Sequence, residues 1–256
     1  MAFALALLAA CAPKPIALPS GAGTPYPAYA DALASATTTC RDARELTAEL
    51  GISGRVGRTK LRGRAIVGVV APDRIRLEAL APFGPPVFVL AAHDGRATLL
   101  LPRDDRVLRD AAPEAIVEAL AGVRIDPASL RAALSGCALD ADAAQGATMY
   151  GTEWLAIDLG GGRLLYLRRE GERWLVRGAR TPAFTVTYDE MVAAAPSRIT
   201  IRAGSGEVTA EVRLRVSQVD RNPQLGPEAF EIDVPADAEP ITIEELREAG
   251  PLGDKR

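Results

Sequence analysis

Few residues in this sequence stand in a pattern that indicates acid–base or nucleophilic catalysis. The one histidine, His93, ends an apolar strand pattern. A Ser-His-Asp triad would need it, and no nucleophile-elbow sequence accompanies it. The adjacent carboxylates Asp104 and Asp105 lie between Arg103 and Arg106, which favours an ion-paired surface turn over carboxylate catalysis. We therefore predict no catalytic residues and no enzymatic activity.

Metal and phosphate chemistry find equally little support. The histidine and the three cysteines, Cys11, Cys40 and Cys137, are too scattered to indicate a cluster of metal ligands. The run 160–162 is three glycines between two strand patterns, with no helix after it. This arrangement predicts a hairpin turn and not a phosphate-binding loop. We predict no metal site and no cofactor.

Cys11 stands in a different context, at the end of an apolar start. Residues 1–10 carry no charge, are too few to span a bilayer, and suit the apolar region of a signal peptide. Their end, Leu8-Ala9-Ala10 before Cys11, resembles a bacterial lipobox, which implies cleavage before Cys11 and its acylation by fatty acids such as palmitate. No Lys or Arg precedes the run, which a misplaced start codon would explain. The alternative is an apolar tail with an incidental cysteine.

The segment after Cys11 has the composition of a linker. Residues 11–38 are crowded with Pro, Ala, Gly, Ser and Thr, and they predict a flexible tether of roughly 30 Å. The neutral Ala12 favours the outer membrane over retention in the inner membrane. We expect a folded domain over 39–236 and a tail over 237–256. In an oxidising periplasm Cys40 and Cys137 either form a disulfide or stay buried as free thiols.

Length, hydrophobic content and net charge limit the class of protein. A chain of 256 residues with 48% hydrophobic content predicts a globular protein, and its even strand spacing indicates one domain. The formal charge of −3 gives no net field that would favour nucleic acid. We expect a monomer without a nucleic-acid partner.

The hydrophobic pattern is that of a mainly β (α+β) protein. Strict alternation over 74–79 predicts a strand with one apolar face. A helix is expected from Thr38 or Thr39 to Leu50, two more over 113–120 and 126–134, and a last turn or two over 242–250, where Thr242 and Glu245 have capping-box spacing. About ten or eleven antiparallel strands would form one curved sheet or barrel, with the two middle helices across its open side. The strand patterns cover 52–58, 61–70, 73–80, 87–93, 96–101, 147–158, 163–169, 172–178, 183–189, 197–203, 207–216 and 229–234.

The middle of the chain carries a family resemblance. Leu50 to Val56, Arg76 to Gly84, Leu120 to Val123 and Ser129 to Gly136 resemble the LolB-like outer-membrane lipoproteins, which are similar in fold to the periplasmic carrier LolA. The likeness is most specific over 50–137 and continues to about 235 only as a pattern. It implies an open antiparallel half-barrel whose concave apolar side is covered by helices.

The same resemblance implies what the half-barrel does. It would bind acyl chains of lipoproteins or lipids, accept them from a LolA-like carrier, and deliver them to the outer membrane, on whose periplasmic face a lipid anchor holds it. A structural or regulatory envelope lipoprotein that binds a protein partner is the alternative, and an enzyme acting on lipid or peptidoglycan is a third. The residues expected to line the cavity are Val67, Val69, Ile75, Leu77, Leu99, Trp154 and Trp174.

A stiff loop is the candidate for membrane insertion. Pro82, Phe83 and Gly84 lie between two strand patterns in an uncharged segment with three prolines. A large aromatic side chain there either folds back under the sheet or projects into a bilayer. The LolB-like resemblance favours projection, because that family carries an apolar residue on the matching loop.

Overall fold

The computed structural model describes residues 16–141, 144–192, 195–204 and 209–249. The strands are β1 Thr24–Pro25, β2 Glu45–Val56, β3 Thr59–Val70, β4 Arg74–Leu80, β5 Phe88–His93, β6 Arg96–Leu101, β7 Arg106–Ala111, β8 Gly146–Tyr150, β9 Trp154–Asp158, β10 Leu164–Glu170, β11 Arg173–Arg180, β12 Phe184–Val192, β13 Ala195–Ala203, β14 Ala210–Arg221 and β15 Glu239–Pro240. The helices are α1 Tyr29–Arg41, α2 Pro113–Ala121, α3 Pro127–Ser135 and α4 Ile243–Glu248, with a 3-10 helix η1 at Pro227–Phe230.

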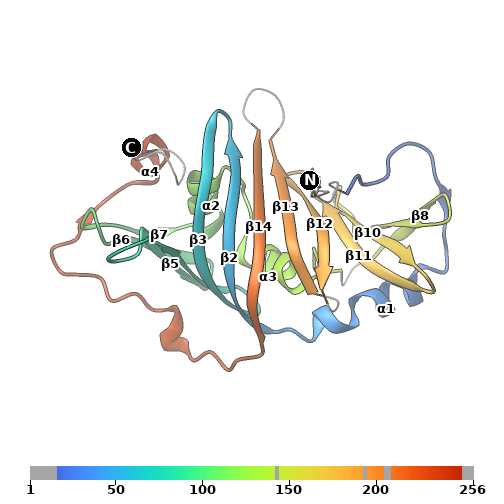
Figure 1. Ribbon diagram of the computed structural model, residues 1–256, viewed down its shortest axis with the longest axis horizontal. Helices are drawn as coiled ribbons and strands as arrows, with labels where there is room; N and C mark the ends of the chain where they lie inside the picture. The colour runs from blue at the N-terminus through green and yellow to red at the C-terminus, as the bar shows by residue number, and fades with distance from the viewer. Residues whose placement is uncertain (1–15, 142–143, 193–194, 205–208, 250–256) are drawn as a thin grey trace, which may run out of the picture.

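The strands form one open sheet in the order β1-β8-β9-β10-β11-β12-β13-β14-β2-β3-β4-β5-β6-β7-β15 (Figure 1). Neighbouring strands are antiparallel except β15, which runs parallel to β7. The mainly β class and the open half-barrel are thus confirmed. The sheet has 15 strands, more than the ten or eleven expected. The pattern at 147–158 forms two strands, β8 and β9, and no pattern in the sequence had indicated β1, β7 or β15.

Helices cover the concave side of this sheet, where the hydrophobic core lies. Helix α1 packs against β11, α3 against β3, β4 and β13, and α2 against β6, while α4 packs on α2. The predicted helices at 113–120 and 126–134 are confirmed: proline occupies the first turn of each. The Asp126 side chain accepts a hydrogen bond from the Ser129 N–H at 2.9 Å, which caps α3. The Thr242–Glu245 capping box is also formed and begins α4.

One predicted helix is wrong. Residues 45–50, expected to end a helix that began at Thr38 or Thr39, instead begin β2, and the helix of this region is α1. β2 pairs with β3 on one side and β14 on the other, and these long-range ladders override the helical propensity of Glu45 to Leu50. The strand expected at 229–234 is also absent, because η1 occupies its start.

The predicted tether is ordered over much of its length. α1 buries Ala32, Leu33 and Thr37, so the folded domain begins well before residue 39. Upstream of α1 the chain lies on the convex face, where the Ile16 N–H donates to Asp189 Oδ1 at 3.3 Å. A Cβ on Gly178 would stand 3.1 Å from Leu18, so this segment touches β11 directly. We call residues 16–25 the N-terminal strap.

The C-terminal chain crosses the convex face of the other half of the sheet. Arg76 donates to the Glu231 carbonyl at 2.8 Å, and the Arg74 guanidinium stands 5.6 Å from the centre of the buried Phe230 ring. The chain then pairs with β7 through β15, and α4 buries Leu246 in the core. We call residues 222–241 the C-terminal strap. The predicted tail at 237–256 is therefore part of the domain as far as α4.

Candidate functional site

The apolar concave face is the candidate binding site, and most of its predicted residues are there. Val67, Val69, Ile75 and Leu99 are 0–1% exposed, and the half-buried Leu77 packs against the same cluster. β3, β4 and β6 supply these side chains by alternation, since every second residue of each strand points to the helices. The half-buried Trp174 of β11 also packs against the cluster.

The expectation for Trp154 is wrong. Its neighbours Leu155 and Ile157 are fully buried in the core, so alternation along β9 turns Trp154 to the convex face. There it lies opposite Arg168, whose guanidinium carbon is 5.6 Å from the centre of the indole ring. The strand Trp-Leu-Ala-Ile-Asp is apolar at both alternating sets of positions, so the sequence did not identify which set faces the core.

The helix layer is attached to the sheet and to itself by specific links. Tyr188 of β12 is fully buried, and its hydroxyl donates to the Ala133 carbonyl of α3 at 2.8 Å. Burial raises the pKa of Tyr188 above its ordinary value, so the group stays a neutral donor. Cys40 at the end of α1 and Cys137 just after α3 form a disulfide, with their Cα atoms 5.4 Å apart. The links hold α1 and α3 together over a core that the chain's own side chains fill.

A cleft of about 550 Å³ opens at one end of this core. Its walls are the link between α2 and α3, the segment after α3, and the turns β9–β10 and β11–β12. Leu139 and Phe184 line it and also belong to the buried core, so the cleft borders the apolar interior at these two residues. Its rim is charged, where Arg124 pairs with Glu114 at 3.1 Å and Arg163 donates to the Asp140 carbonyl at 3.0 Å. Sequence reasoning missed this cleft, because its walls come from four separated segments.

The loop between β4 and β5 presents Phe83 to solvent. The Phe83 side chain is 89% exposed, the largest value among the exposed large apolar residues described. Arg103, from the β6–β7 turn, donates to the Phe83 carbonyl at 2.7 Å and to the Pro85 carbonyl at 3.2 Å. Gly84 has a φ of +76°, a left-handed conformation that favours glycine. Hydrogen bonds from Arg103 therefore fix the backbone of the loop, and the Phe83 side chain projects into solvent and does not fold back under the sheet.

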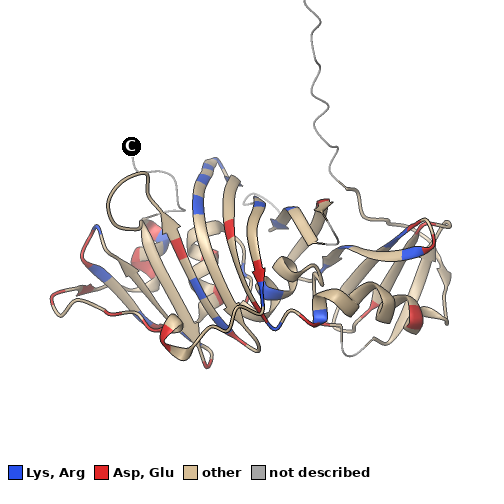
Figure 2. Cartoon of the chain, turned by 60° about the horizontal axis from the view of Figure 1, so that its bottom comes forward, with Lys and Arg blue, Asp and Glu red and all other residues tan. Residues whose placement is uncertain are grey.

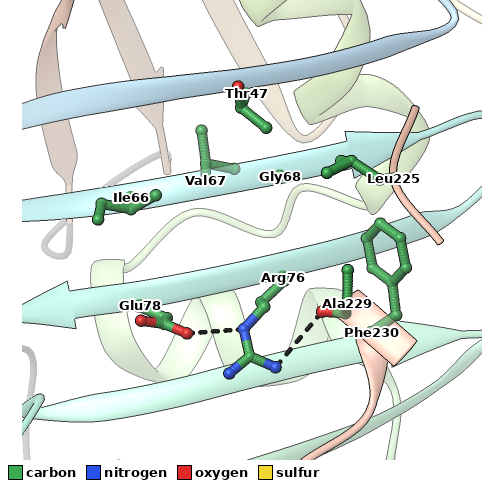
Figure 3. A pocket seen from close by; sticks show the side chains of 9 residues that line it. All are labelled: Thr47, Ile66, Val67, Gly68, Arg76, Glu78, Leu225, Ala229 and Phe230. Atoms are coloured by element: carbon green, nitrogen blue, oxygen red, sulfur yellow. Dashed lines mark hydrogen bonds and ion pairs between the residues drawn. The ribbon is translucent and has the colours of Figure 1, made fainter. Parts of the chain in front are cut away.

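A smaller pocket, of about 170 Å³, lies on the convex face beneath the C-terminal strap (Figure 3). Arg76 forms an ion pair with Glu78 at 2.7 Å and also donates hydrogen bonds to carbonyls of the strap, so its charge is neutralised within the protein. The pocket is thus a packing gap between strap and sheet. Its lining residues are Thr47, Ile66, Val67, Gly68, Arg76, Glu78, Leu225, Ala229 and Phe230.

The residues suited to catalysis are placed apart. His93 is an exposed strand-end residue, with Nδ1 3.1 Å from Asp94 Oδ2. Asp105 lies in the β6–β7 turn, and its carbonyl accepts from the Glu239 N–H. Across the described ranges, no three His, Cys, Asp or Glu side chains gather as a metal site. Within those ranges, too, the helices fall short of the length and apolar character that a membrane span requires. Cys11 lies outside the described residues.

Comparison with known proteins places this arrangement among solved folds. No family model and no curated sequence matches the chain. A LolA superfamily protein from Nitrosomonas europaea matches with a TM-score of 0.50 at 12% identity, over 77% of this chain and 98% of that one. A putative outer membrane lipoprotein-sorting protein domain from Vibrio parahaemolyticus gives 0.45 at 11% identity, over 78% and 96%. A DUF1329 family protein from Desulfovibrio piger gives 0.46 at 12%, over 78% and 94%. The chain thus shares the fold of this LolA superfamily protein, as the resemblance in its sequence implied.

Proposed function

We propose that this protein is a lipoprotein anchored to the periplasmic face of the outer membrane, which binds acyl chains of lipoproteins or lipids and delivers them to that membrane. The observation that carries the proposal is the apolar concave face of an open sheet, lying under a separate layer of helices. Such a site needs no catalytic residue, because each methylene removed from water contributes about 0.8 kcal/mol of affinity. Acceptance of cargo from a LolA-like periplasmic carrier belongs to the same proposal.

Entry of an acyl chain requires the helix layer to move. The core is filled in the described structure, so a chain must displace α1, α2 or α3 from the sheet. The cleft that ends at Leu139 and Phe184 supplies the entrance, since it borders the core at these two residues. The charged rim around it suits the polar end of an acylated molecule, while the acyl chains replace helix contacts inside.

Cargo binding is testable with protein that lacks its anchor. A Cys11→Ser chain is purified from the soluble fraction and examined by native mass spectrometry for bound acylated species. Leu77→Asp, on the concave face, is expected to reduce the bound fraction about tenfold, because a carboxylate there opposes apolar contact. Val219→Asp is the matched control, since Val219 is 37% exposed. Equal occupancy in both variants, or empty protein throughout, would sink the cargo proposal, and empty protein would favour the protein-binding alternative.

Delivery is assigned to the exposed Phe83. Burying one Phe side chain in a bilayer contributes about 1.5–3 kcal/mol, enough to orient a protein that is already anchored. Phe83→Glu is expected to leave thermal stability and cargo occupancy unchanged and to slow transfer of cargo to liposomes at least about fivefold. Val192→Glu is the control, because Val192 is also exposed, at 59%, but ends β12 at the opposite end of the sheet. A large drop in the melting temperature of Phe83→Glu would instead assign Phe83 to the core.

The N-terminal strap affects how the anchor would hold the domain. Ile16 is bound to Asp189, so only the four residues 12–15 lie between an acylated Cys11 and the sheet, and the five steps from Cys11 to Ile16 span at most about 18 Å. The domain would then be held closer to the bilayer than the distance of roughly 30 Å expected for the predicted 28-residue tether. Cys11→Ser is expected to move the protein to the soluble fraction, and unchanged retention in detergent-extractable outer membrane would refute the anchor.

A further inference from the structure

The middle of the convex face is left uncovered by both straps. The N-terminal strap contacts the sheet at β11 and β12, through Gly178 and Asp189. The C-terminal strap contacts it near Gly68 and Arg76, toward the end of the sheet away from the β2–β3 turn. Between the two straps the convex faces of β13, β14, β2 and β3 lie open toward the viewer in Figure 1.

This open area is rich in cations although the whole chain is slightly acidic. Between Glu49 and Asp73 the sequence has no Asp or Glu, while it has five Lys or Arg residues. All five are exposed, and Figure 2 shows basic residues concentrated along the β2–β3 hairpin. They are Arg55, Arg58, Lys60, Arg62 and Arg64.

Strand register places these cations in rows with others from β13 and β14. Three adjacent rows of paired residues cross the four strands from β3 to β13. Each row carries at least two cations, and the three rows together contain one acidic residue, Glu211. We call this area the basic face. The first row is Lys60, Arg55, Glu211 and Arg202; the second is Arg62, Ser53, Arg213 and Thr200; the third is Arg64, Gly51, Arg215 and Arg198.

The protein neutralises only part of this charge. Glu211 pairs with Arg202 at 2.8 Å and also with Arg213, Glu49 lies 3.6 Å from Arg64, and Glu190 lies 3.3 Å from Arg198. Among the described residues, no ion pair forms at the remaining cations of the hairpin or at Arg215. Moreover, Arg55 and Lys60 stand directly opposite each other, which destabilises a strand pair. Glu211 lies opposite Arg55 on the other side, but it is already shared by Arg202 and Arg213, so the surface keeps an excess of positive charge that suits an external anion.

The basic face also shares an end of the sheet with Phe83. Arg64 of β3 is opposite Leu80 of β4, three residues before Phe83. Because the strands are antiparallel, the β2–β3 turn and the β4–β5 loop lie at the same end. Cations along a sheet beside one exposed aromatic side chain match a flat partner that is negatively charged outside and apolar beneath.

We propose that the basic face binds the anionic headgroups of a lipid bilayer. A bilayer fits better than a small anion, because the cations are spread over four strands and converge on no pocket. Each Lys or Arg near an anionic membrane strengthens binding about fivefold, so several of them act together without individual sites. This interaction goes beyond the proposed delivery of acyl chains, since it requires no cargo.

Vesicle binding by the full Cys11→Ser chain tests this proposal. Vesicles of phosphatidylethanolamine with phosphatidylglycerol are compared with vesicles of phosphatidylethanolamine with phosphatidylcholine, by co-sedimentation at low and high salt. Preference for the anionic vesicles, weakened by salt, is expected. Lys60→Glu with Arg62→Glu is expected to reduce this binding more than about tenfold.

The control applies the same charge change elsewhere. Arg109→Glu with Arg169→Glu replaces two exposed cations, on β7 and β10, that make no ion pair among the described residues. Equal loss in both double variants, or no preference for anionic vesicles, overturns the proposal. If the first variant misfolds, Arg58→Glu in the β2–β3 turn replaces it. Binding of anionic vesicles by Arg58→Glu at the wild-type level would also overturn the proposal.

The outcomes separate this proposal from cargo delivery. Protein that purifies without acylated cargo but still prefers anionic vesicles refutes the delivery function and keeps the basic face. Protein that carries cargo but binds both vesicle types equally refutes the role of the basic face and leaves the delivery function standing. Binding to an acidic protein without binding to anionic vesicles counts against the bilayer as partner.

Discussion

The two halves of the sheet bury their residues in different ways. In the half formed by β2 to β7, the strands β2 to β4 send apolar residues to the helices and charged residues to the convex face. In the half formed by β8 to β14, the strands β10, β12 and β13 also bury Tyr166, Thr187 and Thr200 on the convex side, each 1% exposed. There Asp189 accepts from Thr200 Oγ1 at 2.5 Å and from the Ile16 N–H. The first half thus carries charged residues and the C-terminal strap on its convex face, while the second half buries polar groups there that hold the N-terminal strap.

The largest expected effect comes from the disulfide, which joins α1, over the second half, to α3, which packs against strands of both halves. Cys40→Ala with Cys137→Ala removes a link between positions 97 residues apart and is expected to lower the free energy of unfolding by about 4 kcal/mol. Both tryptophans lie in the second half, so their fluorescence reports that half in urea. If losing the link loosens α1, fluorescence should change at lower urea than circular dichroism. Coincident curves would indicate one cooperative unit.

Matched truncations test whether the two halves share one core. Leu99 in β6 and Leu165 in β10 are both 0% exposed and belong to the same cluster. Leu99→Ala and Leu165→Ala are each expected to lower the free energy of unfolding by about 3 kcal/mol. Chemical denaturation measures both, and a cost near zero in one of them would show that its half packs loosely.

The attachment of the N-terminal strap has a smaller expected cost. Asp189→Ala removes the acceptor for the Ile16 N–H and the Thr200 hydroxyl and is expected to destabilise the protein by about 2 kcal/mol. Amide hydrogen exchange in residues 16–23 should accelerate more than exchange in the C-terminal strap. Glu172→Ala, at an exposed turn, is the control and should change neither. Unchanged exchange in Asp189→Ala would show that the strap is held by its apolar contacts.

The smallest expected effect is local and depends on pH. Hydrogen bonding from the Thr242 N–H and hydroxyl, with help from Arg106, lowers the pKa of Glu245 below its ordinary value. A lowered pKa stabilises the folded helix above the ordinary pKa, and this contribution disappears as the pH falls through the lowered value. Exchange of amides in α4 should therefore rise on acidification. Glu245→Gln should remove that dependence, and a persistent dependence would implicate another group.

The sequence predicted the first half of the sheet better for a physical reason. Arg74 to Ala79 alternates strictly because one face of β4 meets the core and the other is polar. Trp154 lies on a strand with apolar residues on both faces, and alternation then carries no information about which face is inside. The buried network around Asp189 was equally hidden, since it joins residue 16 to strands more than 170 positions away.

Local propensity failed where distant pairing decides. Glu45 to Leu50 reads as a helix but is held in β2 by ladders to β3 and β14. Pro113 and Asp126, by contrast, begin helices through contacts within one turn, and their prediction was correct. For the candidate site, the strand pattern placed most of the expected residues on the side that faces the core, and their binding of acyl chains stays a prediction. The projection of Phe83 was favoured by the family resemblance. The entrance cleft did not follow from the sequence, because no local pattern links its walls.

The two shortest strands have a consequence for how copies of this protein behave together. An open sheet ends in unpaired N–H and C=O groups, which are a template for strands of another molecule. β1 pairs with only two residues of β8, and β15 with only two of β7. β1 and β15 thus block edge-to-edge pairing at the two edges of the sheet, although the residues of both strands are exposed. Disrupting the pairing of β1 or β15 alone should cost more in solubility at high concentration than in the stability of the monomeric fold.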